Sequence, residues 1–452
     1  MKIIVVGCGK IGTTIVESLV AEGHDVTAID SQASVLEELI NIYDVMSVCG
    51  NGADHDVLQE ADTAHADLFV AVTGSDETNM LSCFLARKLG AQHTIARIRN
   101  PEYNDHSLVF LKQHLGLSLA INPEQLAARE LMNLLKFPSA VKVDTFSHRN
   151  FEMIELRLRD DSPLDGVRLS EMRTRFDAKF LVCVVQRGTE VYIPDGRFEL
   201  KSGDKIVLTA SPAELQKLLR AMGVLQKKAR SVMILGGSRT ALYLAQLLEA
   251  AGNSVTLIEK DAAMAQELSA QLPKTVIIHG DGTQQELLME EDLTSKDALV
   301  ALTGIDEENI LMSIFAASQN VPKVIAKVNR DELASLAEHL GLDTIVSPRK
   351  IVSDILVRYA RALQNSMGSS METLYQLMDG KAEALEFLVR DEPGVVGIPL
   401  KDLSTKPNTL IAGIIRDRKT LIPSGNDMIL AGDHVIVLAA NRRLQDLSDI
   451  LK

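Results

Sequence analysis

The sequence repeats itself over nearly its whole length, with a shift of 229 or 230 positions. Val5–Gly7 aligns with Ile234–Gly236, and Val72–Asn79 aligns with Leu302–Asn309. The later part of each half also matches, because Ile193–Gly196 aligns with Ile422–Gly425. Chance does not keep one register over so many segments, so the 452 residues must form two copies of one folding plan.

Each copy starts with strand-like apolar runs that alternate with helical patterns. In the first copy the runs Ile3–Val6, Val26–Ile29 and Leu68–Val72 alternate with the helical patterns Thr13–Ala21 and Thr78–Leu89. Short β-rich segments around a polar helix follow. We therefore expect an α/β chain of two tandem Rossmann-like doubly wound domains, each followed by a small α+β domain. The expected bounds are 1–121 and 229–346 for the doubly wound domains, 122–140 and 347–371 for linking helices, and 141–228 and 372–452 for the small domains.

A linking helix leaves each doubly wound domain. Asn122 and Ser347 are capping residues that each precede a proline, which is favoured at the first position of a helix. The first of these helices carries an apolar stripe that includes Leu131, Leu134 and Leu135. The sequence leaves two alternatives open: the stripe docks on a neighbouring molecule, or it packs within the same chain.

A glycine turn follows the first strand and leads into a helix. Gly7 permits a tight turn, Gly9 lets the backbone approach a diphosphate, and Gly12 allows close packing of helix and strand. The start of the helix offers free amides and a partial positive charge. In this context we expect the turn residues Gly7, Cys8, Gly9, Lys10 and Ile11 to bind a dinucleotide, with Lys10 counted only for its backbone amide.

Asp30 ends the second strand, 18 residues after Gly12. At this position a carboxylate accepts hydrogen bonds from the adenosine ribose hydroxyls, and its charge repels a 2′-phosphate. No arginine follows directly, since Ser31 and Gln32 come next. We therefore predict NAD(H) as the cofactor rather than NADP(H), with ATP or ADP as the alternative ligand of the same sites.

Further candidates stand at the ends of later strands. Thr73 and Gly74 follow Leu68–Val72 at the edge where open α/β sheets bind ligands, so they either face the ligand or only lead into a helix capped by Asp76. Arg97 ends another apolar run and either reaches the diphosphate or an acidic group of a partner, or is a solvated side chain.

The second copy keeps only part of this pattern. Ser238 stands where Gly9 allows close approach, and its side chain leaves the occupancy of the second site open. Glu259 keeps the acid and Lys327 replaces Arg97. The candidate residues of the second site are Gly236, Gly237, Ser238, Arg239, Thr240, Glu259, Thr303, Gly304 and Lys327.

Charge, hydropathy and residue spacing argue against several classes of function. There are 47 basic and 61 acidic residues, giving a formal net charge of −14, which argues against nucleic acid as a partner. The first apolar run ends too early for a signal peptide, and no apolar stretch reaches the roughly 20 residues of a membrane span, so we expect a cytoplasmic protein. The four cysteines and ten histidines have no metal-ligand spacing, so no metal is predicted.

Together these features resemble the TrkA family of potassium-uptake regulators, in which a NAD-binding part and a smaller C-terminal part occur twice. The resemblance covers essentially the whole chain. It is carried by Met1–Gly7 with Asp30, by Ala71–Met80, by Ile95–Arg99 and by Pro123–Leu126.

The resemblance implies a regulatory subunit that is no enzyme. It would lie on the cytoplasmic face of the cell membrane, bind a membrane-embedded potassium-translocating subunit and gate it in response to nucleotide. It also implies a homo-tetrameric ring. The same family pattern assigns the dinucleotide sites to the turn, acid, threonine, glycine and basic positions given above for each copy.

Two other functions remain open on the sequence. An NAD-dependent dehydrogenase is disfavoured because none of the six tyrosines has a lysine four positions later, and residues 151–225 contain no histidine for proton transfer. A nucleotide sensor that regulates a different channel or enzyme is the second alternative.

Overall fold

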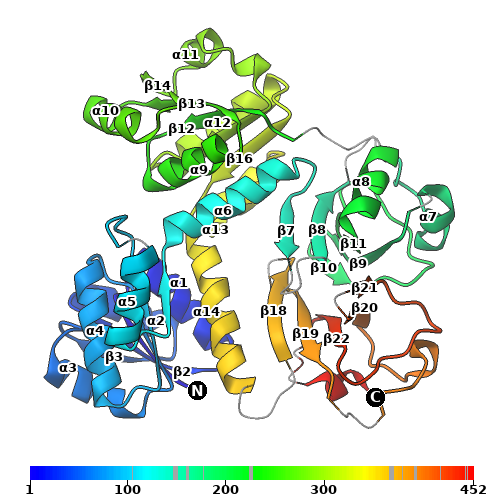
Figure 1. Ribbon diagram of the computed structural model, residues 1–452, viewed down its shortest axis with the longest axis horizontal. Helices are drawn as coiled ribbons and strands as arrows, with labels where there is room; N and C mark the ends of the chain where they lie inside the picture. Colours follow the sequence, from blue (N-terminus) through cyan, green and yellow to red (C-terminus); the bar gives the residue numbers. More distant parts are fainter. Residues whose placement is uncertain are drawn as a thin grey trace. The chain divides into compact units, whose positions relative to one another are not determined.

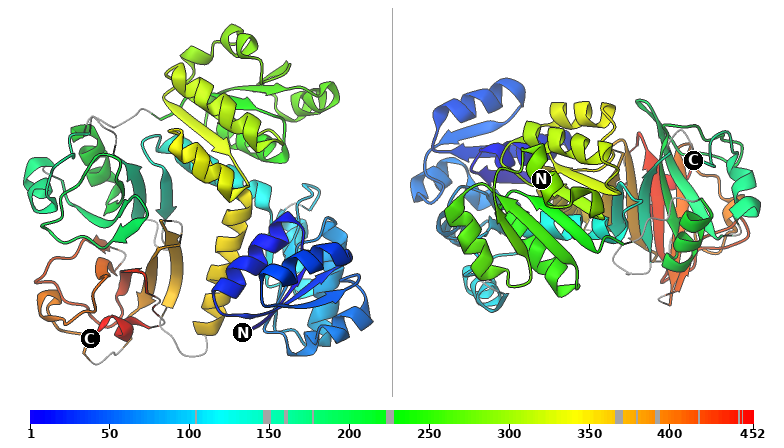
Figure 2. Two further views of the ribbon diagram at one scale, coloured as in Figure 1. Left: turned by 180° about the vertical axis from the view of Figure 1, so that it is seen from behind. Right: turned by 90° about the horizontal axis from the view of Figure 1, so that it is seen from above.

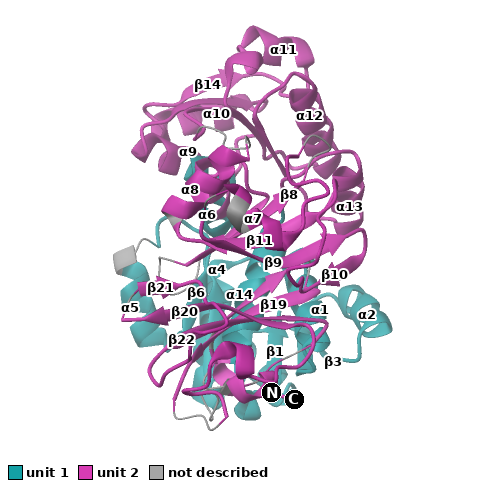
Figure 3. Ribbon diagram, turned by 90° about the vertical axis from the view of Figure 1, so that its right-hand side faces the viewer, with its two compact units in different colours: residues 1–129, 239–244, 346–361 teal, residues 130–238, 245–345, 362–452 magenta. Residues whose placement is uncertain are grey.

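The computed structural model describes residues 1–103, 105–145, 151–158, 162–176, 178–222, 228–365, 371–378, 380–390, 394–417, 419–442, 444 and 446–452. It divides into two compact units, coloured separately in Figure 3. The first comprises residues 1–129, 239–244 and 346–361. The second comprises residues 130–238, 245–345 and 362–452.

The first doubly wound domain has a six-stranded parallel sheet in the order β3-β2-β1-β4-β5-β6 (Figure 1). Its central strand β1 is fully buried from Ile3 to Val6, because both faces of a parallel sheet are covered by helices. The strand order reverses between β1 and β4, which opens a gap at their carboxyl ends. The elements are β1 (Lys2–Val6), α1 (Lys10–Ala21), β2 (Asp25–Asp30), α2 (Ala33–Ile42), β3 (Met46–Cys49), α3 (His55–Glu60), β4 (Leu68–Ala71), α4 (Asp76–Leu89), β5 (His93–Arg97), α5 (Asp105–Leu115) and β6 (Leu119–Ile121).

The second doubly wound domain repeats this plan with the strand order β14-β13-β12-β15-β16-β17. Its central strand β12 pairs in parallel with β13 and β15, as β1 does with β2 and β4. The elements are β12 (Ser231–Leu235), α9 (Arg239–Ala250), β13 (Ser254–Glu259), α10 (Ala262–Gln271), β14 (Val276–His279), α11 (Gln285–Glu290), β15 (Ala298–Ala301), α12 (Asp306–Ser318), β16 (Lys323–Lys327), α13 (Asp331–His339) and β17 (Ile345–Val346).

Each small domain contains a five-stranded antiparallel sheet, with the orders β10-β9-β11-β8-β7 and β18-β19-β22-β20-β21. The predicted fold class is therefore confirmed in both copies. The elements are β7 (Lys142–Thr145), β8 (Glu152–Arg157), α7 (Leu169–Phe176), β9 (Phe180–Arg187), β10 (Glu190–Tyr192), β11 (Lys205–Ala210), α8 (Pro212–Ala221), β18 (Met371–Leu377), β19 (Ala382–Leu388), β20 (Thr409–Arg416), β21 (Lys419–Leu421) and β22 (His434–Ala440). Short 3₁₀ helices cover Thr63–His65, Leu293–Ser295, Leu400–Asp402 and Leu447–Ile450.

The two small sheets share a core. In strand β8, Ile154 and Leu156 lie in the core of their own domain. Met153 of the same strand and Phe151, which precedes it, join a cluster with residues of the second sheet: Ala384, Ala412, Ile436 and Leu438. The ring of Phe151 lies so close to Gly413 that a Cβ there would stand 2.3 Å from its Cε2 atom. Successive side chains of a strand point to opposite faces, so one strand serves both cores.

The linking helices are α6 (Pro123–Lys136) and α14 (Pro348–Asn365). Both predicted caps form, because Asn122 accepts a hydrogen bond from the backbone amide of Gln125 at 3.0 Å and Ser347 accepts one from that of Lys350 at 3.4 Å. The apolar stripe of α6 is buried within this chain, which supports the second of the two alternatives.

Helix α14 comes from the second copy but packs on the first doubly wound domain (Figures 1 and 2). The Ser353 hydroxyl donates to the carbonyl of Thr14 in α1 at 3.4 Å. Further along the helix, Arg361 forms an ion pair of 2.5 Å with Glu22, and both side chains are buried. The end of α1 is therefore tied to a helix that leads toward the second small domain.

Candidate nucleotide-binding sites

The first glycine turn, residues 7–9, connects β1 to α1 at the point where the strand order reverses. Gly7 has φ of +88°, a conformation that side chains disfavour, and a Cβ there would lie 2.7 Å from the backbone nitrogen of Thr73. Gly9 is the N-cap of α1 and carries no side-chain oxygen for the first-turn amides. Those amides and the helix dipole can therefore serve an anion. Lys10 is exposed at the first position of α1, and Ile11 is half-buried behind it.

Asp30 ends β2 and holds the turn from its other side. Its carboxylate accepts hydrogen bonds from the backbone amides of Cys8 at 2.7 Å and Gln32 at 2.9 Å. A carboxylate has about four acceptor positions, so two amide donors still leave room for ribose hydroxyls. Burial, reinforced by the charge of Asp30, raises the pKa of the Cys8 thiol to about 12. The Cys8 thiol is therefore neutral, and Cys8 takes part in the turn through its backbone amide.

The glycines of the site differ in what surrounds them. A Cβ on Gly12 would lie 1.9 Å from the carbonyl oxygen of Gly7, so this glycine serves the packing of α1. A Cβ on Gly9 or on Gly74 would meet no atom within 4 Å. These two positions border open space at the carboxyl ends of β1 and β4, where a ligand would approach the backbone.

The loop after β4, residues 72–75 (the Thr73 loop), is fixed by Asn79 in the first turns of α4. The Asn79 side-chain oxygen accepts from the Thr73 amide at 2.8 Å and the Thr73 hydroxyl at 2.7 Å, and its nitrogen donates to the carbonyl of Arg97 at 2.9 Å. Asn79 is fully buried, so it holds the ends of β4 and β5 together.

Arg97 does not extend into solvent, so that alternative is wrong. Its side chain is only 9% exposed and its guanidinium donates to the carbonyl of Thr73. Burial, together with the nearby Arg99 charge, lowers the pKa of Arg97. A buried guanidinium beside the Thr73 loop is placed to support an anion at the same strand ends.

The proposed cap by Asp76 is also wrong. Ser75 caps α4, accepting from the amide of Thr78 at 3.1 Å. The buried Asp76 carboxylate instead accepts from the amides of Arg99 at 2.8 Å and Asn100 at 2.7 Å. The sequence analysis assigned no role to Asn79. The available signal was the duplication, because Asp76 and Asn79 recur in the second copy as Asp306 and Asn309.

The second glycine turn, residues 236–238, has the same backbone form. Gly236 has φ of +90°, and the amide of Gly237 donates to the carboxylate of Glu259. A Cβ on Gly237 would lie 2.6 Å from Leu268 and 2.9 Å from Glu259, so the longer acid needs glycine at this position. Ser238 ends the turn. Arg239 and Thr240 open α9, whose first turns cluster with the first compact unit (Figure 3).

The loop after β15, residues 302–305 (the Thr303 loop), repeats the arrangement around Asn309. The Asn309 side chain accepts from the amide of Thr303 at 2.9 Å and donates to the carbonyl of Lys327 at 2.9 Å. The Lys327 ammonium donates to the carbonyl of Leu302 at 3.3 Å, in place of the Arg97 contact. A Cβ on Gly304 would again meet no atom within 4 Å.

Within the described residues, no three His, Cys, Asp or Glu side chains are grouped as metal ligands. Every helix in the described part of the chain is too short or too polar to cross a lipid bilayer.

Comparison with known proteins adds to these observations. The TrkA-N domain model matches residues 3–123 and 232–348, and the TrkA-C domain model matches residues 153–223 and 384–452. The Trk system potassium uptake protein TrkA homolog of Archaeoglobus fulgidus is 33% identical over the full length of both chains. The Trk system potassium uptake protein TrkA of Vibrio alginolyticus is 31% identical over 98% of this chain and 96% of its own. These relatives are named for potassium uptake, not for a reaction, in agreement with the prediction that the chain is no enzyme.

Solved structures share the fold at low identity. The GsuK channel bound to NAD is 17% identical, with a TM-score of 0.62 over 97% of this chain and 77% of that one. The GsuK RCK domain is 18% identical, with a TM-score of 0.62 over 97% of this chain and 92% of its own. Both copies match the same pair of domain models, and the identity to full-length relatives spans the whole sequence, so this chain belongs to the TrkA family.

Proposed function

We propose that this protein is a cytoplasmic, NAD(H)-binding regulatory subunit of a potassium-uptake system. It would bind a membrane-embedded potassium-translocating subunit at the cytoplasmic face of the membrane and gate it by a nucleotide-dependent change of conformation. The observation that carries the proposal is the first glycine turn beside Asp30, at the point of strand reversal, in a member of the TrkA family.

In the first lobe the ligand diphosphate would lie against Gly7–Ile11 at the start of α1. Asp30 would accept hydrogen bonds from the adenosine ribose, and its charge favours NAD(H) over a 2′-phosphorylated dinucleotide. Thr73 and Gly74 would border the other half of the ligand, with Arg97 behind them as a buried cation. ATP or ADP, which carry the same adenosine and diphosphate groups, would compete for this site.

The second lobe would use Gly236–Thr240, Glu259, Thr303, Gly304 and Lys327. The turn and the acid have the same hydrogen-bond pattern as in the first lobe. The two lobes differ at Ser238. Its side chain occupies the turn position that corresponds to Gly9, and Gly9 borders open space. We therefore propose that the second site binds the same ligand class more weakly.

Gating would follow from differential affinity. A nucleotide that contacts the glycine turn and the Thr73 loop at once favours the lobe geometry in which both fit it, and a ligand shifts an equilibrium only by such a difference. Asn79 transmits the position of the Thr73 loop to β5, and Glu22 ties α1 to α14. Oxidised, reduced and adenosine-only ligands would then stabilise different conformations.

The binding step is tested by calorimetric titration of NADH into the wild type and the Asp30→Ala and Asp30→Asn variants. Loss of the ribose acceptor should weaken NADH binding by about tenfold or more, equivalent to about 1.4 kcal/mol. The matched control is Glu37→Gln, an exposed acid on α2. Equal affinity in all four proteins would remove Asp30 from the site. Failure of the wild type to bind NAD, NADH and ATP would overturn the regulator proposal.

The regulatory step requires the membrane partner. Co-purification in detergent with a Trk-type translocating subunit, followed by potassium flux measurements in vesicles, should show NADH-dependent flux in the complex. An NADH oxidation assay with simple carbonyl substrates serves as the counter-test, since turnover would favour a dehydrogenase.

A further inference from the structure

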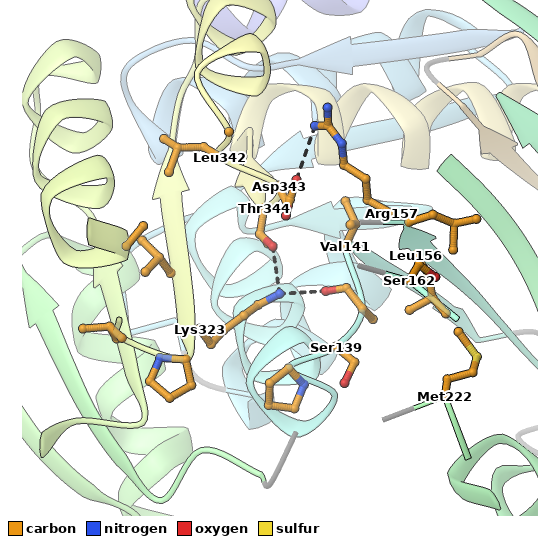
Figure 4. Close-up of a pocket in the computed structure, with 18 of the residues that line it drawn as sticks. Ser139, Val141, Leu156, Arg157, Ser162, Met222, Lys323, Leu342, Asp343 and Thr344 are labelled. Carbon is orange, nitrogen blue, oxygen red and sulfur yellow. Dashed lines mark hydrogen bonds and ion pairs between the residues drawn. The ribbon is translucent and has the colours of Figure 1, made fainter. Parts of the chain in front are cut away.

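A cavity of about 230 Å³ lies within the second small domain. It is separate from the cavity beside Lys323, whose ammonium already donates to the carbonyl of Ala140 and to the hydroxyl of Thr344 (Figure 4). The walls of the 230 Å³ cavity come from the 3₁₀ helix Leu400–Asp402, the start of β20, the loop 423–425 after β21, strand β22 and the last 3₁₀ helix. All of these elements belong to one domain, so the cavity is a feature of that domain's own fold.

This cavity has an apolar inner end and a polar outer end. Val437 of β22 and Ile450 of the last 3₁₀ helix are fully buried and line it from the core. Lys401 and Ser424 are exposed and line it from the surface. A ligand in this space would therefore place an apolar group inward and a polar group toward solvent.

The first small domain fills the corresponding region with its own side chains. Leu400 begins a 3₁₀ helix of three residues at the position where Leu169 begins the eight-residue helix α7. In both copies the amide of this leucine donates to a carbonyl of the neighbouring loop, which establishes the correspondence. Helix α7 carries Met172 and Phe176, which are buried in the core of the first domain. The 3₁₀ helix of the second copy ends too early to supply a counterpart of Phe176.

A second aromatic side chain is also missing from the second copy. The first residue of β9 is Phe180 and that of β20 is Thr409, and the strand registers place them at the same point of the two sheets. Phe180 is 3% exposed and belongs to the same buried cluster as Phe176. Thr409 lines the cavity instead, and its hydroxyl donates to the carbonyl of Lys406 at 2.6 Å. The cavity thus lies where the first copy has aromatic rings.

At its polar end the cavity has a lysine where the first copy has a serine. Lys401 corresponds to Ser170, because each donates its amide to the carbonyl of the glycine in the neighbouring loop. The Lys401 ammonium donates to the side-chain oxygen of Asn426 at 2.9 Å. This oxygen is neutral and an ammonium has three donors, so the charge and two donors are left for a carboxylate.

We propose that this cavity binds a small aromatic carboxylate, with its ring in the apolar end and its carboxylate at Lys401. The ring would occupy the region that Phe176 and Phe180 fill in the first copy. The volume of 230 Å³ is below the usual range for drug-sized ligands, and an apolar cavity of about 150 Å³ already binds one benzene ring.

Such a ligand would contact the 3₁₀ helix Leu400–Asp402, strand β20 and the loop 423–425 together. It would therefore favour the arrangement of these three segments that fits it best, and would act as an effector separate from the nucleotide. The binding itself does not depend on the proposed nucleotide sites.

The test is saturation-transfer NMR of the full-length protein titrated with phenylacetate. Acetate, which lacks the ring, and benzyl alcohol, which lacks the charge, are the two control ligands. Phenylacetate should bind with a Kd of about 1 mM or lower, and each control ligand should bind at least about tenfold more weakly. No binding of phenylacetate, or equal binding of either control ligand, would overturn the proposal.

Two variants test the two ends of the cavity separately. Thr409→Phe gives the second copy the residue that the first copy has at this point of the sheet, so it should fold and should abolish binding by filling the space. Lys401→Met changes an exposed side chain and should weaken phenylacetate binding by about tenfold without affecting benzyl alcohol.

The matched control is Lys419→Met, an exposed lysine of β21, which should bind phenylacetate as the wild type does. NADH affinity should be the same in all variants, which separates this result from the nucleotide proposal. The proposal is wrong if either Thr409→Phe or Lys401→Met, folded as judged by circular dichroism, binds phenylacetate with wild-type affinity. Lys401→Met alone remains decisive if Thr409→Phe does not fold.

Discussion

At the residue scale, the two glycine turns differ at two positions in contact with each other: the second residue of the turn and the acid that accepts its amide hydrogen bond. The first turn combines Cys8 with the shorter acid Asp30, and the second combines Gly237 with the longer acid Glu259. In both, the acid accepts a hydrogen bond from the amide of the turn. A Cβ on Gly237 would collide with Glu259, so the two positions must change together.

The exchange of Gly9 for Ser238 provides a direct test of ligand approach. Gly9→Ser should weaken NADH binding to the first lobe by about tenfold, because the new side chain enters open space that the diphosphate needs. Ser238→Gly should strengthen binding to the second lobe. Calorimetry measures both. Thermal unfolding of Gly9→Ser should match the wild type, since its Cβ meets no protein atom; a loss of stability instead of affinity would contradict the argument.

The Cys8 thiol gives a prediction about pH. Burial raises its pKa to about 12, so at pH 8 only about one thiol in ten thousand is ionised and reactive toward iodoacetamide. Cys49 is exposed and should be alkylated readily. Mass spectrometry of the native protein should find Cys49 labelled and Cys8 unlabelled at pH 8, with Cys8 labelling increasing as the pH approaches 12. Rapid labelling of Cys8 near neutral pH would show that the turn opens.

At the scale of single elements, the loop after β4 was only partly predictable. Its position followed from the strand pattern, and the duplication marked its sequence as constrained. Three details did not follow: the cap by Ser75, the buried side chain of Arg97, and the role of Asn79. The burial of Arg97 and the role of Asn79 depend on which strand ends meet in space, and hydrophobic periodicity does not specify side-chain contacts across a sheet. The cap by Ser75 is a local contact with the Thr78 amide, but Ser75 and Asp76 are neighbours and both are residue types that cap helices.

Replacement of Asn79 by alanine should therefore weaken nucleotide binding, because the Thr73 loop would lose the side chain that holds it in place. The change leaves the Thr73 amide and the Arg97 carbonyl without their buried partner, which costs about 1–3 kcal/mol for each unsatisfied group. We expect a lower thermal midpoint and weaker NADH binding. The matched variant Asn309→Ala should affect the second lobe and leave first-lobe affinity near the wild type. Wild-type NADH binding in Asn79→Ala would show that the Thr73 loop does not contact the ligand.

The contact between α1 and α14 also makes a measurable prediction. Glu22 and Arg361 are 7% and 8% exposed, and removal of one partner from a buried ion pair costs about 3–5 kcal/mol. Glu22→Gln should increase hydrogen exchange in the second half of α14, measured by mass spectrometry, while Glu37→Gln should leave it unchanged. Unaltered exchange in Glu22→Gln would mean that the apolar contacts of α14 hold it without the ion pair.

At the scale of the whole molecule, the two doubly wound domains expose apolar side chains at corresponding positions. Leu81 of α4 and Leu311 of α12 are 49% and 60% exposed, and Phe110 of α5 and Leu340 after α13 are 60% and 56% exposed. Apolar surface that recurs in both copies is a reasonable basis for the proposed ring of four chains, since exposed apolar patches often mark protein interfaces.

Light scattering coupled to size-exclusion chromatography tests this ring. The wild type should have about four times the mass of one chain. The double variant Leu81→Glu/Leu311→Glu should dissociate, because charges would be buried at the contact. Ile42→Glu is the control, since Ile42 is exposed whereas its counterpart Leu272 is buried. A monomeric wild type, or a double variant that stays tetrameric, would refute the assignment of α4 and α12 to the contacts of the ring.

The architecture itself could be predicted from the sequence because two copies confirm each other. Each strand run in one half has a counterpart in the other, so Val5–Gly7 and Ile234–Gly236 identify the same turn twice. The cavity beside Lys323 could not be predicted in this way. Its lining comes from segments far apart in the sequence, including residues 138–141, Met222 and residues 341–344 (Figure 4), and hydrophobic periodicity does not show that such segments meet.

The placement of the linking helices also limits how the chain can be divided. Residues 348–361 of α14 pack with the first lobe, and the last turns of α6, residues 130–136, cluster with the second unit. Cutting the gene at its midpoint would therefore give an amino-terminal product that lacks the helix packed on its doubly wound domain. In a chain of half this length, the helix that packs on α1 would have to come from a second molecule, whereas the duplication supplies it within one polypeptide.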